Sequence, residues 1–376
     1  MSQAWPPLSF EAWRDTHATL RLWLQMVGKI RLAQSPWLNH SWHVSLYVTP
    51  RGLSTLSIPH GSAAFQIDFD FITHLIVITH SNGRRAELAL RPQPVAAFYR
   101  ALMSLLDELR VPVAIQKKPN EMPEAVPFDQ DERPRAYEAD HAQRFWRVLQ
   151  QCDRVLNVFR ARFRGKSSPV HFFWGNTDLA LTRFSGGRAP EHPGGRPNLP
   201  DRVLKDAYSD ECWECGFWPG GEEYPSALFY ALAYPEPRGF SAMRVLPTAA
   251  HYSKELKEFV LPYDVVRQHE DPDNVVLEFL QGTYEAAAAL GAWDRAALDY
   301  SSPGYVHCSL SSTSQENPMA DDLKETGRQD DQRINVDQDH EVSYWSKELG
   351  VSRDELRRAV EQAGPMVRDV RQHLSR

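Results

Sequence analysis

The side chains best suited to acid–base or metal chemistry are histidines that lie beside two predicted strands. His40 and His43 lie at the entry of the first strand, and His171 lies at the start of a later one. Imidazole changes its protonation near neutral pH, and beside a carboxylate such as Asp178 it can act as general acid and base or bind a metal. We therefore take His43, His171 and Asp178 as catalytic candidates. Hydrogen bonds from these histidines to neighbouring backbone are the alternative interpretation.

Aromatic and polar side chains near the same strands predict a ligand pocket. Large rings wall apolar pockets, and a few polar groups fix the orientation of the ligand. For the Gly-Phe-Trp-Pro-Gly-Gly run at 216–221, a core Trp followed by a tight turn is the alternative. The ligand-binding candidates are His40, Trp42, Tyr47, Trp174, Trp218, Tyr252, Lys254 and Glu255.

The other local motifs give little support to a named chemistry. Cys212 and Cys215 form a single Cys-x-x-Cys pair, which supplies only two metal ligands and lacks a thioredoxin-like context. We interpret them as small apolar residues of a strand. The Gly-rich stretch 185–201 has no phosphate-loop or dinucleotide pattern, and no Gly-x-Ser-x-Gly elbow occurs. We predict no metal site and leave the cofactor open.

Composition bounds the class of protein. The chain has 376 residues, of which 42 are Lys or Arg and 49 are Asp or Glu, so the net charge is −7. That balance argues against coating nucleic acid or a membrane surface. The N-terminus lacks a signal-peptide pattern, and the most apolar run, 75–78, is too short to span a bilayer. We expect a cytoplasmic protein.

Hydrophobic periodicity predicts an α+β fold of antiparallel sheets flanked by helices. Alternation of apolar and polar residues indicates half-buried strands, and spacings of three and four indicate amphipathic helices. Asn82-Gly83 predicts a tight hairpin turn, and 185–201 is expected to be irregular. Asp15 or Thr16 is expected to cap the first helix. The expected strands are 42–49, 65–71, 75–79, 85–90, 170–174, 179–184, 213–218 and 227–234, and the expected body helices are 94–109, 137–164 and 275–287.

The order of these elements repeats, which indicates a duplication of residues 1–116 in residues 136–300. Each half reads as a helix, a hairpin, further strands and a helix, and each first helix ends in a Gly-Lys pair. Chance repetition, common in α+β folds, is the alternative. In two related halves, His43 and His171 would face one cleft, with Trp218 nearby.

Two segments resemble known families. Residues 3–300 resemble a bacterial domain of unknown function, family 5996. Residues 322–375 resemble a second domain of unknown function, family 3606, which is usually a short stand-alone protein. Neither resemblance implies an activity. The first is carried by the runs at 5–8, 22–31, 39–44, 216–221, 233–237 and 252–256, and the second by those at 333–336, 344–345, 349–352, 356, 359–360, 364 and 367–374.

The chain therefore divides into a body, a linker and a tail. The body is 1–300, the polar linker is 301–332 with an internal Met319, and the helical tail is 333–376. Predicted helices at 338–348 and 353–363 resemble a helix-turn-helix, with Ser352 as the cap of the second. Its exposed cations, which would meet phosphates, are Arg353, Arg357 and Arg358.

Three classes of function remain open. The leading hypothesis is a ligand-binding or enzymatic body of unknown specificity, with a small molecule as partner and no membrane. The first rival is a nucleic-acid-associated accessory protein that acts through the tail. Residues 321–376 hold 13 acids and ten bases, however, and DNA-binding domains are usually far more basic. The second rival is a structural or interaction protein, which a centre without a cleft would favour.

Overall fold

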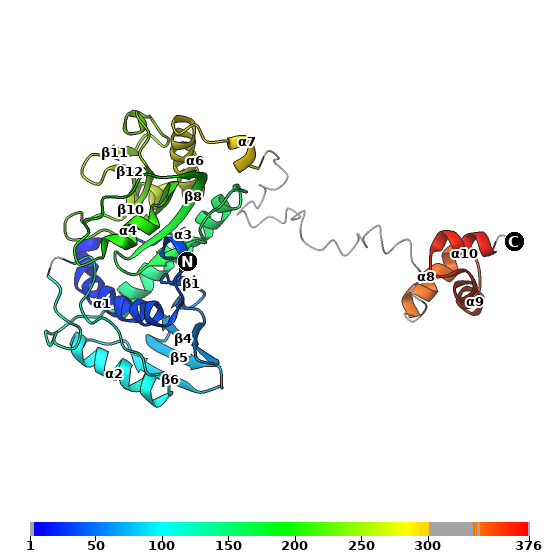
Figure 1. Cartoon of the computed structure of the whole chain (residues 1–376), viewed down its shortest axis with the longest axis horizontal. Helices are drawn as coiled ribbons and strands as arrows, with labels where there is room; N and C mark the ends of the chain where they lie inside the picture. The colour runs from blue at the N-terminus through cyan, green and yellow to red at the C-terminus, as the bar shows by residue number, and fades with distance from the viewer. Residues whose placement is uncertain (1–3, 123, 301–333, 335, 337–338, 375–376) are drawn as a thin grey trace. The chain divides into compact units, whose positions relative to one another are not determined.

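The computed structural model describes residues 4–122, 124–300, 334, 336 and 339–374. The chain separates into two compact units, 1–302 and 303–376, which are coloured along the sequence in Figure 1. The predicted linker, 301–332, lies outside the described residues. The unit 1–302 contains the body, and the unit 303–376 contains the tail.

The first half of the body builds an antiparallel sheet in which the strands follow one another as a meander. Its strand order is β1-β2-β4-β5-β6, and the short β3 pairs with β4. The predicted turn is confirmed, because Gly83 has the positive φ that joins β5 to β6. The strands are β1 (Tyr47–Thr49), β2 (Gly52–Ser54), β3 (Ile58–His60), β4 (Ala63–Asp70), β5 (Leu75–His80) and β6 (Arg85–Ala89).

The second half builds another antiparallel sheet with the order β11-β12-β10-β9-β8-β7. β8 extends to Arg188, so the expectation that residues 185–201 form no regular structure was wrong at its start. A register shift after Phe184 lets the Gly-rich end stay paired with β9. The strands are β7 (His171–Phe173), β8 (Asp178–Arg188), β9 (Asp210–Trp218), β10 (Leu228–Tyr234), β11 (His251–Ser253) and β12 (Glu258–Pro262).

The two sheets meet edge to edge at one pair of residues. Leu46 N donates to Phe172 O at 2.8 Å, and Phe172 N donates to Leu46 O at 2.7 Å. The predicted strand at 42–49 is therefore correct only at its end. Residues 42–44 form a turn and a bend instead, which redirect the chain so that Leu46 reaches the second sheet.

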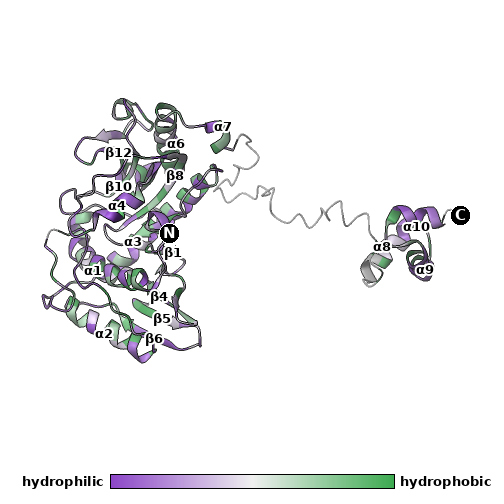
Figure 2. Cartoon of the chain, in the orientation of Figure 1, coloured by the Kyte–Doolittle hydropathy of each residue, from purple (hydrophilic) through white to green (hydrophobic). Residues whose placement is uncertain are grey.

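The long helix α3 (Ala139–Arg160) holds the body together, because it packs against strands of both sheets. Phe145 contacts Trp13 of α1 (Phe10–Gln34) with ring centroids 4.8 Å apart, and Phe159 contacts Trp213 of β9 at 5.6 Å. α1 begins at Phe10, before the predicted caps Asp15 and Thr16. Figure 2 shows the apolar strands β5 and β8 within the body. The remaining body helices are α2 (Val95–Glu108), α4 (Asp201–Ala207), α5 (Tyr263–Gln268), α6 (Pro272–Leu290), α7 (Arg295–Leu298), η1 (Asn39–Ser41) and η2 (Phe240–Ala242).

The described part of the tail is a small helical unit with its own core. Its helices are α8 (Asp339–Leu349), α9 (Arg353–Ala363) and α10 (Val367–Leu374). The predicted capping box is confirmed: Ser352 and Glu355 bond to each other's backbone N–H groups. Trp345 and Leu356 pack in the core with five smaller apolar residues. The predicted fold class, antiparallel sheets flanked by helices with a helical tail, is confirmed.

Candidate functional site

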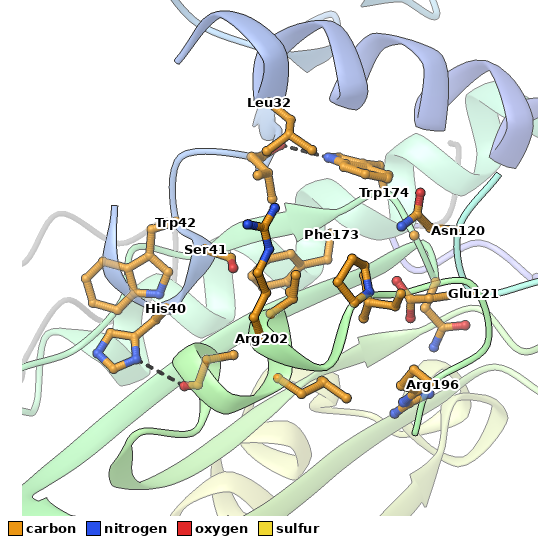
Figure 3. Close-up of a pocket in the computed structure, with 18 of the residues that line it drawn as sticks. Leu32, His40, Ser41, Trp42, Asn120, Glu121, Phe173, Trp174, Arg196 and Arg202 are labelled. Carbon is orange, nitrogen blue, oxygen red and sulfur yellow. Dashed lines mark hydrogen bonds between the residues drawn. The ribbon is translucent and has the colours of Figure 1, made fainter. Parts of the chain in front are cut away.

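A pocket of about 530 Å³ opens on one face of the second sheet, beneath α4. Both halves of the body line it. The end of α1, the segment around η1 and residues 116–121 come from the first half. The turn after β7, strands β8 and β9, and the segment 196–208 come from the second half. Figure 3 shows the aromatic side chains Trp42, Phe173 and Trp174 along its wall.

Strand alternation decides which side chains reach the pocket. Successive residues of a strand point to opposite faces, so Asp178, Thr182 and Phe184 of β8 line the pocket. Leu179 and Leu181, which lie between them in the sequence, are fully buried in the core. By the same rule Glu214 of β9 lies on the pocket face.

Two carboxyl groups on the floor of the pocket share one phenol. Tyr230 of β10 donates its hydroxyl to Asp178 Oδ2 at 2.9 Å and lies 3.5 Å from Glu214 Oε1. The hydroxyl of Tyr208 is 3.3 Å from Glu214 Oε2. We call Asp178, Glu214 and Tyr230 the acid cluster. Its members come from three adjacent strands, so the position of each is fixed by the sheet.

Burial raises the pKa of each carboxyl group at the floor of the pocket, and the charge of Asp178 adds to the shift of Glu214. Burial raises the pKa of Asp178 to about 6, although the Tyr230 hydrogen bond opposes the shift. Burial, followed by the charge of Asp178, raises the pKa of Glu214 to about 7. Burial, followed by the charges of Glu214 and Asp178, raises the pKa of Glu258 on β12 to about 8. Carboxyl groups that titrate near neutral pH suit general acid–base chemistry.

The opening of the pocket carries cationic side chains, and one of them, Arg196, acts electrostatically on the buried carboxyl groups Glu121 and Asp178. Lys118, Arg196 and Arg202 line the pocket, and within the described residues none has a carboxylate at salt-bridge distance. Arg202 lies over the ring of Trp37, with 5.6 Å from its guanidinium carbon to the ring centroid. Figure 3 shows Arg202 extending from α4 into the pocket. These cations create a positive opening above the acid cluster.

A polar stripe along α1 fixes the segment that forms one wall. Arg21 donates to Gly175 O at 2.8 Å and to Glu121 O at 2.9 Å. Burial raises the pKa of the Glu121 carboxyl, although Arg196 and Arg21 oppose the shift. One turn further along α1, Gln25 bonds to Asn120. The loop 116–121 is thus bound to α1 by named polar contacts.

Gly28 and Trp174 form the contact between α1 and the pocket wall. A Cβ at position 28 would lie 2.1 Å from Trp174 Nε1, so only glycine lets the indole pack against the helix. Trp174 Nε1 donates to Val44 O at 2.8 Å, as Figure 3 shows. Lys29, which follows Gly28 in α1, is 4% exposed and donates to Asn120 Oδ1.

His40 lines the other end of the pocket, in a strained backbone. His40 and Ser41 both have left-handed φ values, 58° and 59°, which are costly for residues with a Cβ. His40 Nδ1 lies 3.0 Å from Ala207 O at the end of α4, so this nitrogen carries the proton. Nε2 accepts from Lys166 Nζ at 2.6 Å, and Lys166 also bonds to Asp210 at 2.9 Å.

The structure does not bring His43 and His171 together in this pocket, because neither lines it. His43 Nδ1 accepts from Leu38 N at 3.2 Å, the backbone contact of the alternative interpretation. His171 is fully buried beside Trp42 and Phe173, and neither ring nitrogen has a hydrogen-bond partner within the described residues. Burial lowers the pKa of His171 to about 3, so the ring is neutral.

Of the other predicted residues, the structure brings His40, Trp42, Trp174 and Asp178 together in the pocket. Trp218 does not line the pocket, but its Nε1 donates to the carbonyl of Asn176, which does, at 3.2 Å. The remaining predicted residues do not line it. Tyr47 packs on Arg31, Tyr252 bonds to Glu236, and Lys254 and Glu255 are exposed in the β11–β12 turn.

Several residues of the pocket were missed by the sequence analysis. Glu214 lies between Cys212 and Cys215 in the Cys-x-x-Cys motif. The carboxylate itself belongs to no sequence motif that would predict a site. Three residues apart on one strand, the two thiols point to opposite faces, so they form no joint site. Within the described residues no group of three His, Cys, Asp or Glu side chains could hold a metal. The missed residues that line the pocket or its floor are Lys29, Glu121, Arg196, Arg202, Tyr208, Glu214 and Tyr230.

Comparisons with known proteins agree with the two resemblances. A model described as a family of unknown function, DUF5996, matches residues 5–300. A model described as a protein of unknown function, DUF3606, matches residues 322–375. Both resemblances predicted from the sequence are confirmed. No curated protein and no solved structure matches the chain. In the described part of the chain, no helix combines the length and apolarity that crossing a bilayer requires.

Proposed function

The chain belongs to the family of unknown function DUF5996, and we propose that its body binds a small organic anion in the pocket and exchanges protons with it. The observation that carries the proposal is the acid cluster: two carboxyl groups joined through Tyr230 at the floor of an aromatic-walled pocket. The pKa values of these groups lie close to neutral pH, where proton transfer in both directions is efficient.

The charge distribution supports an anionic ligand with an apolar portion. Lys118 and Arg202 line the opening with no carboxylate at salt-bridge distance among the described residues, and arginine binds carboxylate and phosphate groups through paired N–H donors. Trp42 and Trp174 offer flat apolar surfaces for the rest of the molecule. A pocket of about 530 Å³ lies within the range typical of small-molecule sites.

A panel of matched ligands tests the proposal on the purified full chain. Benzoate and phenyl phosphate should raise the melting temperature, whereas the uncharged analogue benzamide should not, because a ligand stabilises the folded state that binds it. Arg202→Gln should reduce the benzoate shift, and Arg244→Gln is the matched control because Arg244 is exposed and does not line the pocket. Equal shifts with benzoate and benzamide in every variant would contradict an anion site.

The tail supports a second candidate function. Arg353, Arg357 and Arg358 are all exposed on α9, which follows α8 after a short turn at Gly350. Two helices joined by a short turn resemble a helix-turn-helix, a motif that places its second helix against nucleic acid. The acidic balance of residues 321–376 favours a protein-interaction module instead.

A further inference from the structure

Lys29 is a buried amine on the wall of the pocket. Only 4% of the residue is exposed, and it faces the pocket from the C-terminal part of α1. Buried lysines are rare and are usually paired with a carboxylate. Within the described residues, no carboxylate lies at salt-bridge distance from Lys29; its hydrogen-bond partner is the neutral side chain of Asn120.

The position of this amine is fixed by its neighbours. Lys29 Nζ donates to Asn120 Oδ1. The backbone of Asn120 is held at both polar groups by Gln25: Asn120 N donates to Gln25 Oε1 at 2.7 Å, and Gln25 Nε2 donates to Asn120 O at 3.0 Å. Gln25 and Asn120 therefore act as positioning residues for Lys29. Burial lowers the pKa of Lys29 to about 8, so a substantial share of the amine is neutral near pH 7.5.

We propose that Lys29 forms a Schiff base with an aldehyde or ketone that also bears an anionic group. This substrate class rests on the proposed function, because the cations at the opening would hold the anionic group. A desolvated lysine in an apolar pocket is a recognised nucleophile toward carbonyl compounds. Lys29 has the burial, the fixed position and the access to a pocket that this chemistry requires.

The reaction balances with groups that the pocket contains. The neutral Lys29 amine adds to the carbonyl carbon: a C–N bond forms, the C=O π bond opens, and one amine proton passes to the oxygen, which gives a carbinolamine. A protonated carboxyl group of the pocket, for example Glu121, whose pKa burial raises, then donates a proton to the carbinolamine hydroxyl, the C–O bond breaks and water leaves. The resulting carboxylate takes the remaining nitrogen proton as the C=N bond forms. One amine and one carbonyl give one imine and one water, and no oxidant is needed.

Borohydride trapping tests the proposal directly on the full chain. Phenylpyruvate combines a ketone, a carboxylate and an aromatic ring, and borohydride reduces its imine to a stable secondary amine. We expect one adduct per chain, located on Lys29 by peptide mass mapping, with yield that rises with pH through about 8. Lys29→Arg should abolish the adduct while keeping the cation and its bond to Asn120. Lys254→Arg, at an exposed site outside the pocket, should leave it unchanged.

Other outcomes separate this inference from the proposed function. An adduct spread over surface lysines, or one that persists in Lys29→Arg, would overturn the inference. If no adduct forms on Lys29 of the natural chain while benzoate still raises its melting temperature, the anion site stands without Schiff-base chemistry. If the Lys29 adduct forms but neither benzoate nor Arg202→Gln reduces its yield, the amine is reactive and the anion site is wrong. Near-ultraviolet circular dichroism of Lys29→Arg checks that the variant is folded.

Discussion

Tyr230 reaches Asp178 across the strand that separates them, because the residue between them is Gly216. Tyr230 lies on β10 and Asp178 on β8, and β9 runs between. Gly216 is the register partner of Tyr230. A Cβ at this position would lie 2.7 Å from the Tyr230 hydroxyl and 2.1 Å from Leu179 O. The hydrogen bond of 2.9 Å therefore depends on a missing side chain.

Gly216→Ala should destabilise the body by about 1–3 kcal/mol, since the new methyl group meets backbone and the phenol at once. Urea unfolding followed by tryptophan fluorescence measures this change, because ten of the 11 Trp lie in the body. Gly282→Ala is the matched control: its Cβ would meet only ordinary contacts at 3.7 Å and beyond, inside α6. That substitution should stabilise by about 0.5–1 kcal/mol. Equal effects at the two glycines would contradict the packing argument.

Asp178→Asn should make the body less sensitive to rising pH. The folded pKa of Asp178 is about 6, above its unfolded value of about 4, so the folded state binds more protons between these values. The free energy of unfolding of the natural chain therefore falls as pH rises through this window. Relative to the natural chain, Asp178→Asn should gain about 1–2 kcal/mol at pH 8 and almost nothing at pH 4. Urea unfolding at both pH values, with exposed Glu255→Gln as control, measures the difference. A gain of the same size at pH 4 would refute it.

Glu214→Gln should also make the free energy of unfolding less sensitive to rising pH, over a higher pH range than Asp178→Asn. Burial and Asp178 raise the folded pKa of Glu214 to about 7, so its loss of stability extends from about pH 4 to above pH 7. In the double variant with Asp178→Asn, the gain should be smaller than the sum of the single gains, because the charge of Asp178 contributes to the raised pKa of Glu214. A double-variant series at pH 8 measures this coupling. Strict additivity would mean that the two carboxyl groups do not interact.

His171→Phe should protect the body against acid. The folded pKa of His171 is about 3, below the unfolded value of about 6.5, so the unfolded state binds more protons between these values. Stability is therefore lost as pH falls below about 6.5, and the variant should gain about 1–3 kcal/mol at pH 4.5 relative to its change at pH 7.5. Unfolding curves at the two pH values test this. If a folded His171→Phe variant lost benzoate binding, His171 would instead have a catalytic or binding role.

The triple variant Arg353→Ala, Arg357→Ala and Arg358→Ala addresses the tail. We expect the full chain to leave duplex DNA unshifted in a gel at low salt, since residues 321–376 hold 13 acids and only ten bases. The triple variant should likewise leave duplex DNA unshifted. Salt-dependent DNA binding that disappears in the triple variant would establish the nucleic-acid role for α9.

Local patterns were sufficient to predict most of the secondary structure. The Asn-Gly turn, the helix after Pro94 and the capped helix after Ser352 depend on neighbouring residues, and each was confirmed. The strand expected from Trp42 was wrong before Leu46, because tertiary bonds to Phe172 and the turn and bend at 42–44 override the alternation. The duplication stays a prediction, although in each sheet the first strand of that half lies at the shared edge.

The pocket was harder to predict, because it depends on strand register and on chain segments far apart. Asp178, Glu214 and Tyr230 meet only when β8, β9 and β10 pair as they do. Arg196 and Arg202 reach the pocket because the Gly- and Pro-rich segment leads into α4, which covers the sheet. No single stretch of sequence carries either signal. His40, Trp42 and Trp174 were found because they cluster beside the strands where the halves meet.

The paired backbone bonds between Leu46 and Phe172 have a consequence for how the body can be divided. At the inner sheet edge of each half, the N–H and C=O groups of Leu46 or Phe172 are satisfied by the other half. A fragment ending in the segment between α2 and α3 would leave that edge bare, and bare edges recruit other chains into aggregates. Either half expressed alone should therefore accumulate as insoluble protein. Co-expression of the two fragments should restore a soluble complex, with each serving as the missing strand partner of the other.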